Sequence, residues 1–269
     1  MTRFTWFNAT SITLGFAFLY LPIVLLVIYS FNDSRLVTVW GGFSTRWYGE
    51  ALSNDAFLSA AWNTLRIALV SASVATVLGL LAAVVLVRAG RFLGRTLFSG
   101  MVYAPLVMPE VITGLSLLLL FVTLDIPRGL LTIILAHITF SMCYASVVIS
   151  ARLVTFERAL EEAALDLGCN QFSAFLRVTL PNIVPSLVAA WLLAFTLSLD
   201  DLVIASFTSG PGSTTLPMRI YSQVRFGVTP EINALSSMLI GVVTVGVVAA
   251  SLITKRAETR RMQAAQRAG

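Results

Sequence analysis

The sequence has little charge, few cysteines and almost no histidine or lysine. Charged residues make up 12% of the 269 positions, whereas about one quarter is usual in soluble domains. The single lysine, Lys255, follows no glycine-rich phosphate-binding loop, and a Gly-x-Ser-x-Gly nucleophile motif is also missing. Neither a disulfide nor a metal site is expected, because Cys143 and Cys169 fall in different settings and His137 is the only histidine. We therefore expect no nucleotide site, metal or cofactor within this chain.

Hydrophobic residues make up 57% of the sequence and gather in six long runs. A hydrocarbon core of about 30 Å needs roughly 20 residues of helix, so each run is long enough to cross it. The six predicted spans are Ile12–Phe31, Trp62–Val87, Leu97–Leu124, Leu130–Leu153, Asn182–Phe207 and Asn233–Ile253. The first run is too long for a signal-peptide core and is expected to be a retained helix. The sequence thus predicts an all-α, polytopic integral membrane protein with one domain over residues 1–269, in which residues 12–31 form the first helix and residues 62–253 a five-helix core.

The distribution of arginine and lysine predicts which side of the membrane each loop faces. Twelve of these residues lie at span ends that share one side, and five lie on the other side. The twelve are Arg3, Arg88, Arg91, Arg95, Arg152, Arg158, Arg177, Lys255, Arg256, Arg260, Arg261 and Arg267. Positive residues mark the cytoplasmic side, so both termini and the loop at residues 157–181 are expected in the cytoplasm. The net charge of +5 therefore indicates orientation and not a nucleic-acid surface.

The loop at residues 157–181 contains the longest charged and periodic stretch of the chain. From Phe156 to Leu167, apolar residues fall on one helical face and acidic residues on the other, which is typical of an amphipathic helix. Gly168 follows the last periodic residue, where a left-handed conformation closes a helix. A second short helix is expected from Gln171 to Leu180. This pattern alone fits both a surface helix packed on its own bundle and a docking element for a partner.

Two predicted spans carry features that a lipid-facing helix lacks. The second span has a ridge of small residues at intervals of four, formed by Ser71, Ala75, Gly79 and Ala83. Such a ridge lets a neighbouring helix approach closely, so we expect packing there. The third span contains Pro105, Pro109 and Glu110, and backbone freed by proline at membrane depth is tolerated where it is buried or lines a cavity. Glu110 is therefore either a pathway residue or a protonated or paired structural carboxylate.

The fourth span carries one polar stripe on an otherwise apolar helix. His137, Ser141 and Tyr144 recur at i, i+4 and i+7, so they share one face. We expect His137 to bridge two helices by a hydrogen bond rather than to titrate.

The fifth span contains two adjacent carboxylates, Asp200 and Asp201. They stand in its outer half, where a carboxylate costs less than the roughly 2.5–3.5 kcal/mol of the membrane centre. A small and polar stripe that looks like a lining is formed by Ala194, Ser198, Asp201, Ala205 and Thr208. Intramembrane charges are functional by default, and this stripe favours Asp201 over Asp200 as a cation site. The alternative is that the pair binds Arg66 or Arg219 and holds helices together.

Several motifs resemble those of a known family. The order Glu162-Ala163-Ala164, Gly168 and Leu180-Pro181 resembles the EAA loop of ABC importer permeases, where this helix–turn–helix docks into the ATPase subunit. The runs Leu106–Gly114 and Ser198–Phe207 are similar to the polyamine branch, and most of all to the second permease subunit of putrescine importers. The resemblance implies the type I ABC importer permease fold, with cytoplasmic EAA coupling helices, in the bacterial inner membrane.

The resemblance also implies a function and its residues. The chain would be a non-enzymatic subunit that forms, with a second homologous permease, the translocation pathway for polyamines such as putrescine or spermidine. Two copies of a separate ATPase would hydrolyse ATP, and a periplasmic binding protein would deliver the substrate. The expected ATPase-coupling residues are Glu161, Glu162, Ala163, Ala164, Gly168, Leu180 and Pro181. The expected pathway residues, which offer counter-charge, aromatic faces for an ammonium group or polar lining, are Asp200, Asp201, Glu110, Tyr144, Trp191, Phe195, Ser141 and Ser198.

Two other classes of protein compete with this interpretation. A secondary transporter or channel for a small organic cation would also have broken helices and acids in the membrane. It would leave the EAA-like loop without a purpose. An intramembrane hydrolase is disfavoured, because adjacent helical positions point about 100° apart and Asp200 and Asp201 cannot face each other as a dyad.

Overall fold

The computed structural model describes residues 5–36, 39–226, 229–241 and 244–245, and most of them are helical. Within these ranges, β-structure is limited to one isolated bridge between Asn32 and Phe43. The chain divides into two compact units, a first that combines residues 1–55 with residues 222–269 and a second of residues 56–221. The expected all-α class is confirmed.

The first unit begins with helix α1 (Trp6–Tyr29), which starts six residues before the predicted span and buries none of its side chains. The segment after it folds back onto helix α2 (Arg46–Ser53). There the indole Nε1 of Trp47 donates to the carbonyl of Asn32 at 2.8 Å, and the hydroxyls of Ser30 and Tyr48 lie 2.6 Å apart. These bonds satisfy buried polar groups and hold Ser30 and Asn32 against α2.

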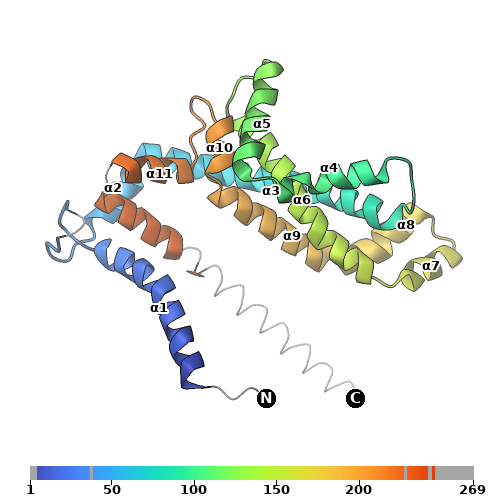
Figure 1. Ribbon diagram of the computed structural model, residues 1–269, viewed down its shortest axis with the longest axis horizontal. Helices are drawn as coiled ribbons and strands as arrows, with labels where there is room; N and C mark the ends of the chain where they lie inside the picture. The colour runs from blue at the N-terminus through green and yellow to red at the C-terminus, as the bar shows by residue number, and fades with distance from the viewer. Residues whose placement is uncertain (1–4, 37–38, 227–228, 242–243, 246–269) are drawn as a thin grey trace. The chain divides into compact units, whose positions relative to one another are not determined.

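Three long helices lie side by side in the second unit (Figure 1). They are α3 (Asp55–Arg88), α6 (Leu130–Thr155) and α9 (Leu180–Asp200). Their shared core includes Ala83, Ile149 and Ile183. A Cβ atom added at Gly79 would lie 2.8 Å from the Cβ of Ala145, so α3 and α6 touch at the predicted ridge of small residues. The packing role expected for that ridge is confirmed.

The third predicted span is wrong as a single helix. Helix α4 (Arg95–Val107) and helix α5 (Glu110–Thr123) meet at an angle of 117°. Met108 adopts an extended conformation, which the following Pro109 favours because its ring clashes with a helical residue before it. Pro109 also lacks the N–H that would continue the helix, so the chain turns here.

The fifth predicted span also differs from the structure, because α9 ends at Asp200. Asp201 is extended, with φ −64° and ψ 122°, and a short helix, α10 (Val203–Thr208), follows. Helix α10 packs against α5 and α6, and its Phe207 approaches Gly114 so closely that an added Cβ atom would lie 2.7 Å from the ring. Helix α11 (Leu216–Phe226) follows, and residues 230–241 are also helical.

Within the described residues, four helices are long and apolar enough to cross a membrane, and α4 with α5 would make a fifth if the bent pair is one span. The sixth predicted span, Asn233–Ile253, is described only in part, and its residues 233–241 and 244–245 are helical. The rest of that span, residues 1–4 and the basic tail from Thr254 lie outside the described residues.

Candidate functional site

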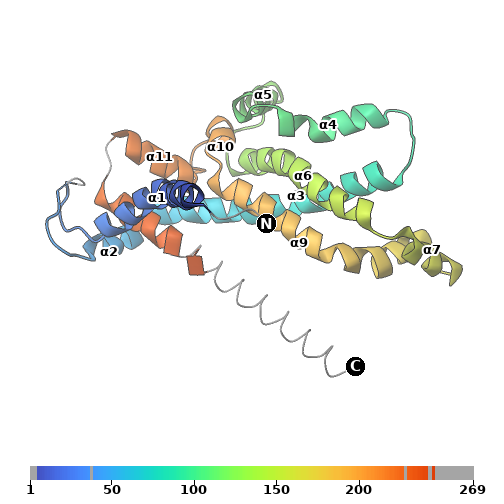
Figure 2. The ribbon, with the colours of Figure 1, turned by 60° about the horizontal axis from the view of Figure 1, so that its bottom comes forward.

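The EAA-like loop lies at one end of the helix bundle, away from α10 (Figure 2). Its first helix is α7 (Arg158–Asp166). Gly168 ends it with φ +88°, and the amides of Gly168 and Cys169 donate to the carbonyls of Leu165 and Ala164 at 2.9 and 3.0 Å. This pair of bonds is the Schellman motif, in which glycine avoids the strain that a Cβ atom would add. The predicted helix and its glycine stop are confirmed.

The second helix of the loop does not end at Leu180 as predicted. Helix α8 (Gln171–Ala174) continues through a π-helical segment, η1 (Phe175–Thr179), directly into α9. Pro181 removes one backbone donor and its ring would clash with the carbonyl four residues before it. The wider π turn provides room at that position. The loop and the fifth span are therefore one continuous 30-residue helix, Gln171–Asp200.

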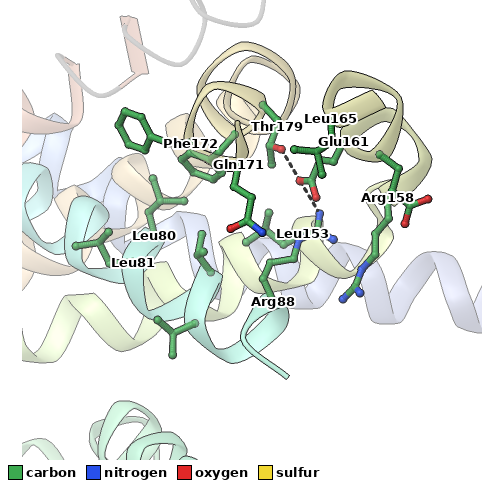
Figure 3. A pocket seen from close by; sticks show the side chains of 15 residues that line it. Leu80, Leu81, Arg88, Leu153, Arg158, Glu161, Leu165, Gln171, Phe172 and Thr179 are labelled. Atoms are coloured by element: carbon green, nitrogen blue, oxygen red, sulfur yellow. Dashed lines mark hydrogen bonds and ion pairs between the residues drawn. The ribbon is translucent and has the colours of Figure 1, made fainter. Parts of the chain in front are cut away.

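A polar junction ties this loop to the end of α3 (Figure 3). The Oε1 atom of Glu161 lies 3.0 Å from Nη2 of Arg88 and also accepts a short hydrogen bond from the hydroxyl of Thr179. The side chains of Arg88 and Glu161 are only 17% and 24% exposed. We call Arg88, Glu161 and Thr179 the Glu161 junction. This junction could not be predicted from the sequence, because Arg88 stood out only as a marker of orientation and lies 73 positions from Glu161.

A cavity of about 800 Å³ opens beside the Glu161 junction. It is lined by apolar residues of α3, such as Leu81 and Val84, and by the loop residues Glu162 and Phe172. Glu162 is exposed, unlike Glu161. Leu167 and Phe172 are 87% and 71% exposed, whereas Phe156 and Ala164 of the predicted apolar face are buried, so only part of that face is accessible. Ala164 is the only buried residue of α7.

The predicted bridging role of His137 is confirmed. Its Nδ1 atom lies 2.6 Å from the hydroxyl oxygen of Ser198, and its Nε2 atom lies 3.1 Å from Oδ2 of Asp201. His137 is 2% exposed and the Asp201 side chain is 7% exposed. An ionised Asp201 requires a proton on Nε2, so in the neutral imidazole Nδ1 accepts from Ser198. His137 thus joins α6 to α9 at the point where α9 breaks.

Asp201 serves the backbone as well as the histidine. Its carboxylate accepts from the amides of Ile204 and Ala205 at 3.3 and 2.7 Å, which satisfies donors in the first turn of α10. The stripe expected to line a pathway is buried inside this chain, since Ala194, Ser198, Ala205 and Thr208 are all closed off. The expected role of this stripe as a lining stays a prediction. The carboxylates also do not pair with Arg66 or Arg219, since Asp201 pairs with His137 and those arginines lie over Trp62 and Phe57.

The other pathway candidates fall in separate places. Asp200 and Glu110 are exposed, and Glu110 lies in the first turn of α5. The rings of Trp191 and Phe195 are stacked, with their centroids 5.1 Å apart and an interplanar angle of 9°. The indole Nε1 of Trp191 donates to the hydroxyl oxygen of Ser73 in α3 at 3.1 Å.

Two pathway candidates lie within α6. Tyr144 packs against Phe140, with ring centroids 5.2 Å apart. The hydroxyl of Ser141 is buried and has no hydrogen-bond partner in the structure. The structure thus joins Ser198 and Asp201 in one cluster and leaves Asp200, Glu110 and the Trp191–Phe195 pair on accessible surfaces.

Comparisons with known proteins agree with this architecture. Residues 75–263 match the family described as binding-protein-dependent transport system inner membrane component. The chain is 57% identical over its full length to the putrescine transport system permease protein PotI of Escherichia coli K12, covering 97% of that protein. It is 42% identical to the spermidine/putrescine transport system permease protein PotC of the same strain, over 89% of this chain and 90% of that one.

Solved structures show the same fold at low sequence identity. A chain from a bacterial ABC transporter involved in the import of alginate superposes with a TM-score of 0.71 at 16% identity, over 94% of this chain and 97% of that chain. A chain from the MetNI methionine ABC transporter gives a TM-score of 0.60 at 18% identity, over 72% and 92%. The expected ABC importer permease fold is confirmed. The chain belongs to the family of binding-protein-dependent transport system inner membrane components and is a multi-pass inner membrane protein.

Proposed function

We propose that this chain is a permease subunit of an ATP-driven importer of polyamines, with putrescine as the main substrate. The observation that carries the proposal is the EAA-like loop, which the permease fold presents at one end of the bundle with the apolar side chains of Leu167 and Phe172 exposed. The 57% identity to a protein named as a putrescine transport permease supports the substrate. A second homologous permease, two ATPase copies and a periplasmic polyamine-binding protein complete the transporter.

The coupling role rests on the exposed residues of α7 and α8. Leu167 and Phe172 offer exposed apolar side chains on which a partner can pack, and Glu162 adds a charge beside them. Gly168 sets the turn between the two helices, and Leu180 and Pro181 begin the span that receives the motion. ATP hydrolysis belongs to the partner, and this chain contributes no catalytic group.

The pathway role falls on accessible groups. Asp200 supplies counter-charge for an ammonium group, and Glu110 supplies a second carboxylate at the start of α5. The stacked rings of Trp191 and Phe195, and the ring of Tyr144, offer faces for cation–π contact. Asp201 acts from behind this surface by holding the α9–α10 break in place.

The test combines purification with transport. The tagged chain is purified from detergent-solubilised membranes, and uptake of radiolabelled putrescine is measured in cells with and without its gene, in a strain without other polyamine importers. We expect an ATPase and a second permease to co-purify, and uptake to be lost on deletion. Uptake that depends on this chain with no ATPase partner would favour a secondary transporter for a small organic cation. An ATPase partner with unchanged putrescine uptake would keep the importer and reject the substrate.

A further inference from the structure

The way α7 is held in place differs from the way the bundle is held. The helices α3, α6 and α9 share a core of fully buried aliphatic residues. Helix α7 contributes one buried residue, Ala164, and its Leu160 and Leu165 side chains remain 46% and 39% exposed. So little apolar burial fixes a nine-residue helix weakly, because the stabilisation scales with the area removed from water. Polar contacts must therefore decide where α7 sits.

Those polar contacts converge on the last turn of α3. The carbonyls at the end of a helix have no partners within it, and cations are favoured there. The guanidinium of Arg158 in α7 lies 3.4 Å from the carbonyl of Val87, and that of Arg95 in α4 donates to the carbonyl of Leu86 at 2.8 Å. Arg88 ends α3 and reaches back over the ring of Phe156 to meet Glu161. The end of α3 is thus held by arginines from both sides.

Glu161 is the point at which three elements meet. Its Oε1 atom binds Arg88 of α3 and Thr179 of the π segment, while its own backbone belongs to α7. Thr179 is fully buried, so its hydroxyl needs this acceptor. Adjacent residues on a helix point about 100° apart, and this is why Glu161 faces the bundle while Glu162 faces outward. The two neighbouring glutamates therefore have different tasks.

We propose that Glu161 is a positioning residue that joins the coupling helix to two spans at once. A displacement of α7 by the ATPase then moves α3 through Arg88 and α9 through Thr179 as one body. The inference rests on the proposed coupling function, and it adds that Glu161 acts within this chain rather than on the partner. Without the Glu161 junction, α7 would shift on the bundle and ATP would be hydrolysed without import.

The test uses the complete importer in proteoliposomes and measures putrescine imported per ATP hydrolysed. The binding protein is supplied on the side of the membrane that corresponds to the periplasm. We expect Glu161→Gln and Arg88→Gln each to lower this ratio about tenfold, the effect of losing one charged hydrogen bond. The double variant should be no worse than either single one, because both changes remove the same interaction. The swap of Arg88→Glu with Glu161→Arg should recover part of the ratio. Arg91→Gln, an exposed change three positions after Arg88 and outside the coupling helices, should leave the ratio unchanged.

The result is read only from complexes that retain the ATPase, so it is separate from the test of the importer itself. An unchanged ratio in Glu161→Gln and Arg88→Gln, or effects of the two that simply add, would overturn the proposal. If Glu161→Gln fails to assemble, Thr179→Val removes only the buried hydroxyl at nearly constant volume. A lowered ratio with normal assembly would then support the junction, and an unchanged ratio would reject it.

Discussion

The carboxylates Asp200 and Asp201 are neighbours in the chain but lie in different environments. Asp201 is enclosed, where it binds His137 and two backbone amides, so its charge is already satisfied. Asp200 is the last residue of α9 and is exposed. A substrate cation would displace structure to reach Asp201, whereas Asp200 is available without any rearrangement. The sequence pattern favoured Asp201, because a stripe of small residues looks the same whether it lines a pathway or packs against a helix.

This difference predicts opposite results for two matched variants. Asp200→Asn should raise the putrescine concentration needed for half-maximal uptake and leave the melting temperature unchanged. Asp201→Asn should lower stability by about 1–3 kcal/mol, since buried partners lose a charged acceptor. Thermal unfolding in detergent and uptake kinetics measure the two effects. Unchanged uptake in a well-assembled Asp200→Asn variant would remove Asp200 from the pathway.

A second residue-scale prediction concerns His137. His137→Phe should destabilise the junction of α6 and α9 by about 1–3 kcal/mol, because it leaves Ser198 and Asp201 without their partner in a buried site. Combined with Asp201→Asn, the total loss should be smaller than the sum of the separate losses. Additive losses, measured by thermal unfolding of the three variants, would contradict the direct interaction.

At the scale of elements, glycines show where close contact determines stability. Gly79 of α3 and Gly100 of α4 are both interior helix positions, but an added Cβ atom meets Ala145 and the Ser146 backbone at Gly79 and open space at Gly100. Gly79→Ala should therefore cost about 1–3 kcal/mol through overpacking. Gly100→Ala should be neutral or stabilising by up to about 1 kcal/mol, since alanine favours the helix. Thermal unfolding of both variants is the measurement, and equal behaviour would argue against the α3–α6 contact.

The turn between α7 and α8 gives a further prediction at this scale. Gly168→Val places a branched side chain at φ +88°, a conformation that costs a residue other than glycine roughly 1–2 kcal/mol or more. We expect reduced co-purification of the ATPase, with normal membrane insertion. Cys169→Ser, next to it in the turn, serves as the control and should retain the partner. If the Gly168→Val variant still recovers the ATPase in full, the conformation of this turn is not needed for docking.

The sequence predicted some elements well and others poorly, for identifiable reasons. Helix α6 begins at Leu130 as expected, because no proline or charged residue falls between Leu130 and its last turn. The break at Pro109 had a signal, but its angle of 117° depends on packing. The break at Asp201 could not be predicted, because no proline lies there. The Glu161 junction joins residues that are far apart in the sequence. Helix propensity and hydrophobic periodicity are local properties, so they do not predict contacts between residues so distant along the chain.

At the scale of the whole molecule, the distribution of charge predicts the topology. The arginines at the end of α3, the start of α4, the end of α6 and the start of α7 gather at the end of the bundle that carries the EAA-like loop. In a variant with both native cysteines replaced by serine, a cysteine at Asp166 should react with a membrane-impermeant maleimide only after the cytoplasmic side is opened. A cysteine at Ser44, which lies between α1 and α2, should react in intact spheroplasts. The reverse pattern would invert the orientation.

The contact of Gly114 with Phe207 has a consequence for how this sequence can change over time. An alanine at position 114 would place its Cβ atom 2.7 Å from the ring of Phe207, so either the ring or one of the two helices would have to shift. A lineage that gains alanine or serine at 114 should therefore tend to acquire a smaller residue at 207. The two positions, 93 apart in the chain, should drift as a pair, and a history of paired substitutions would record that α5 and α10 have stayed in contact.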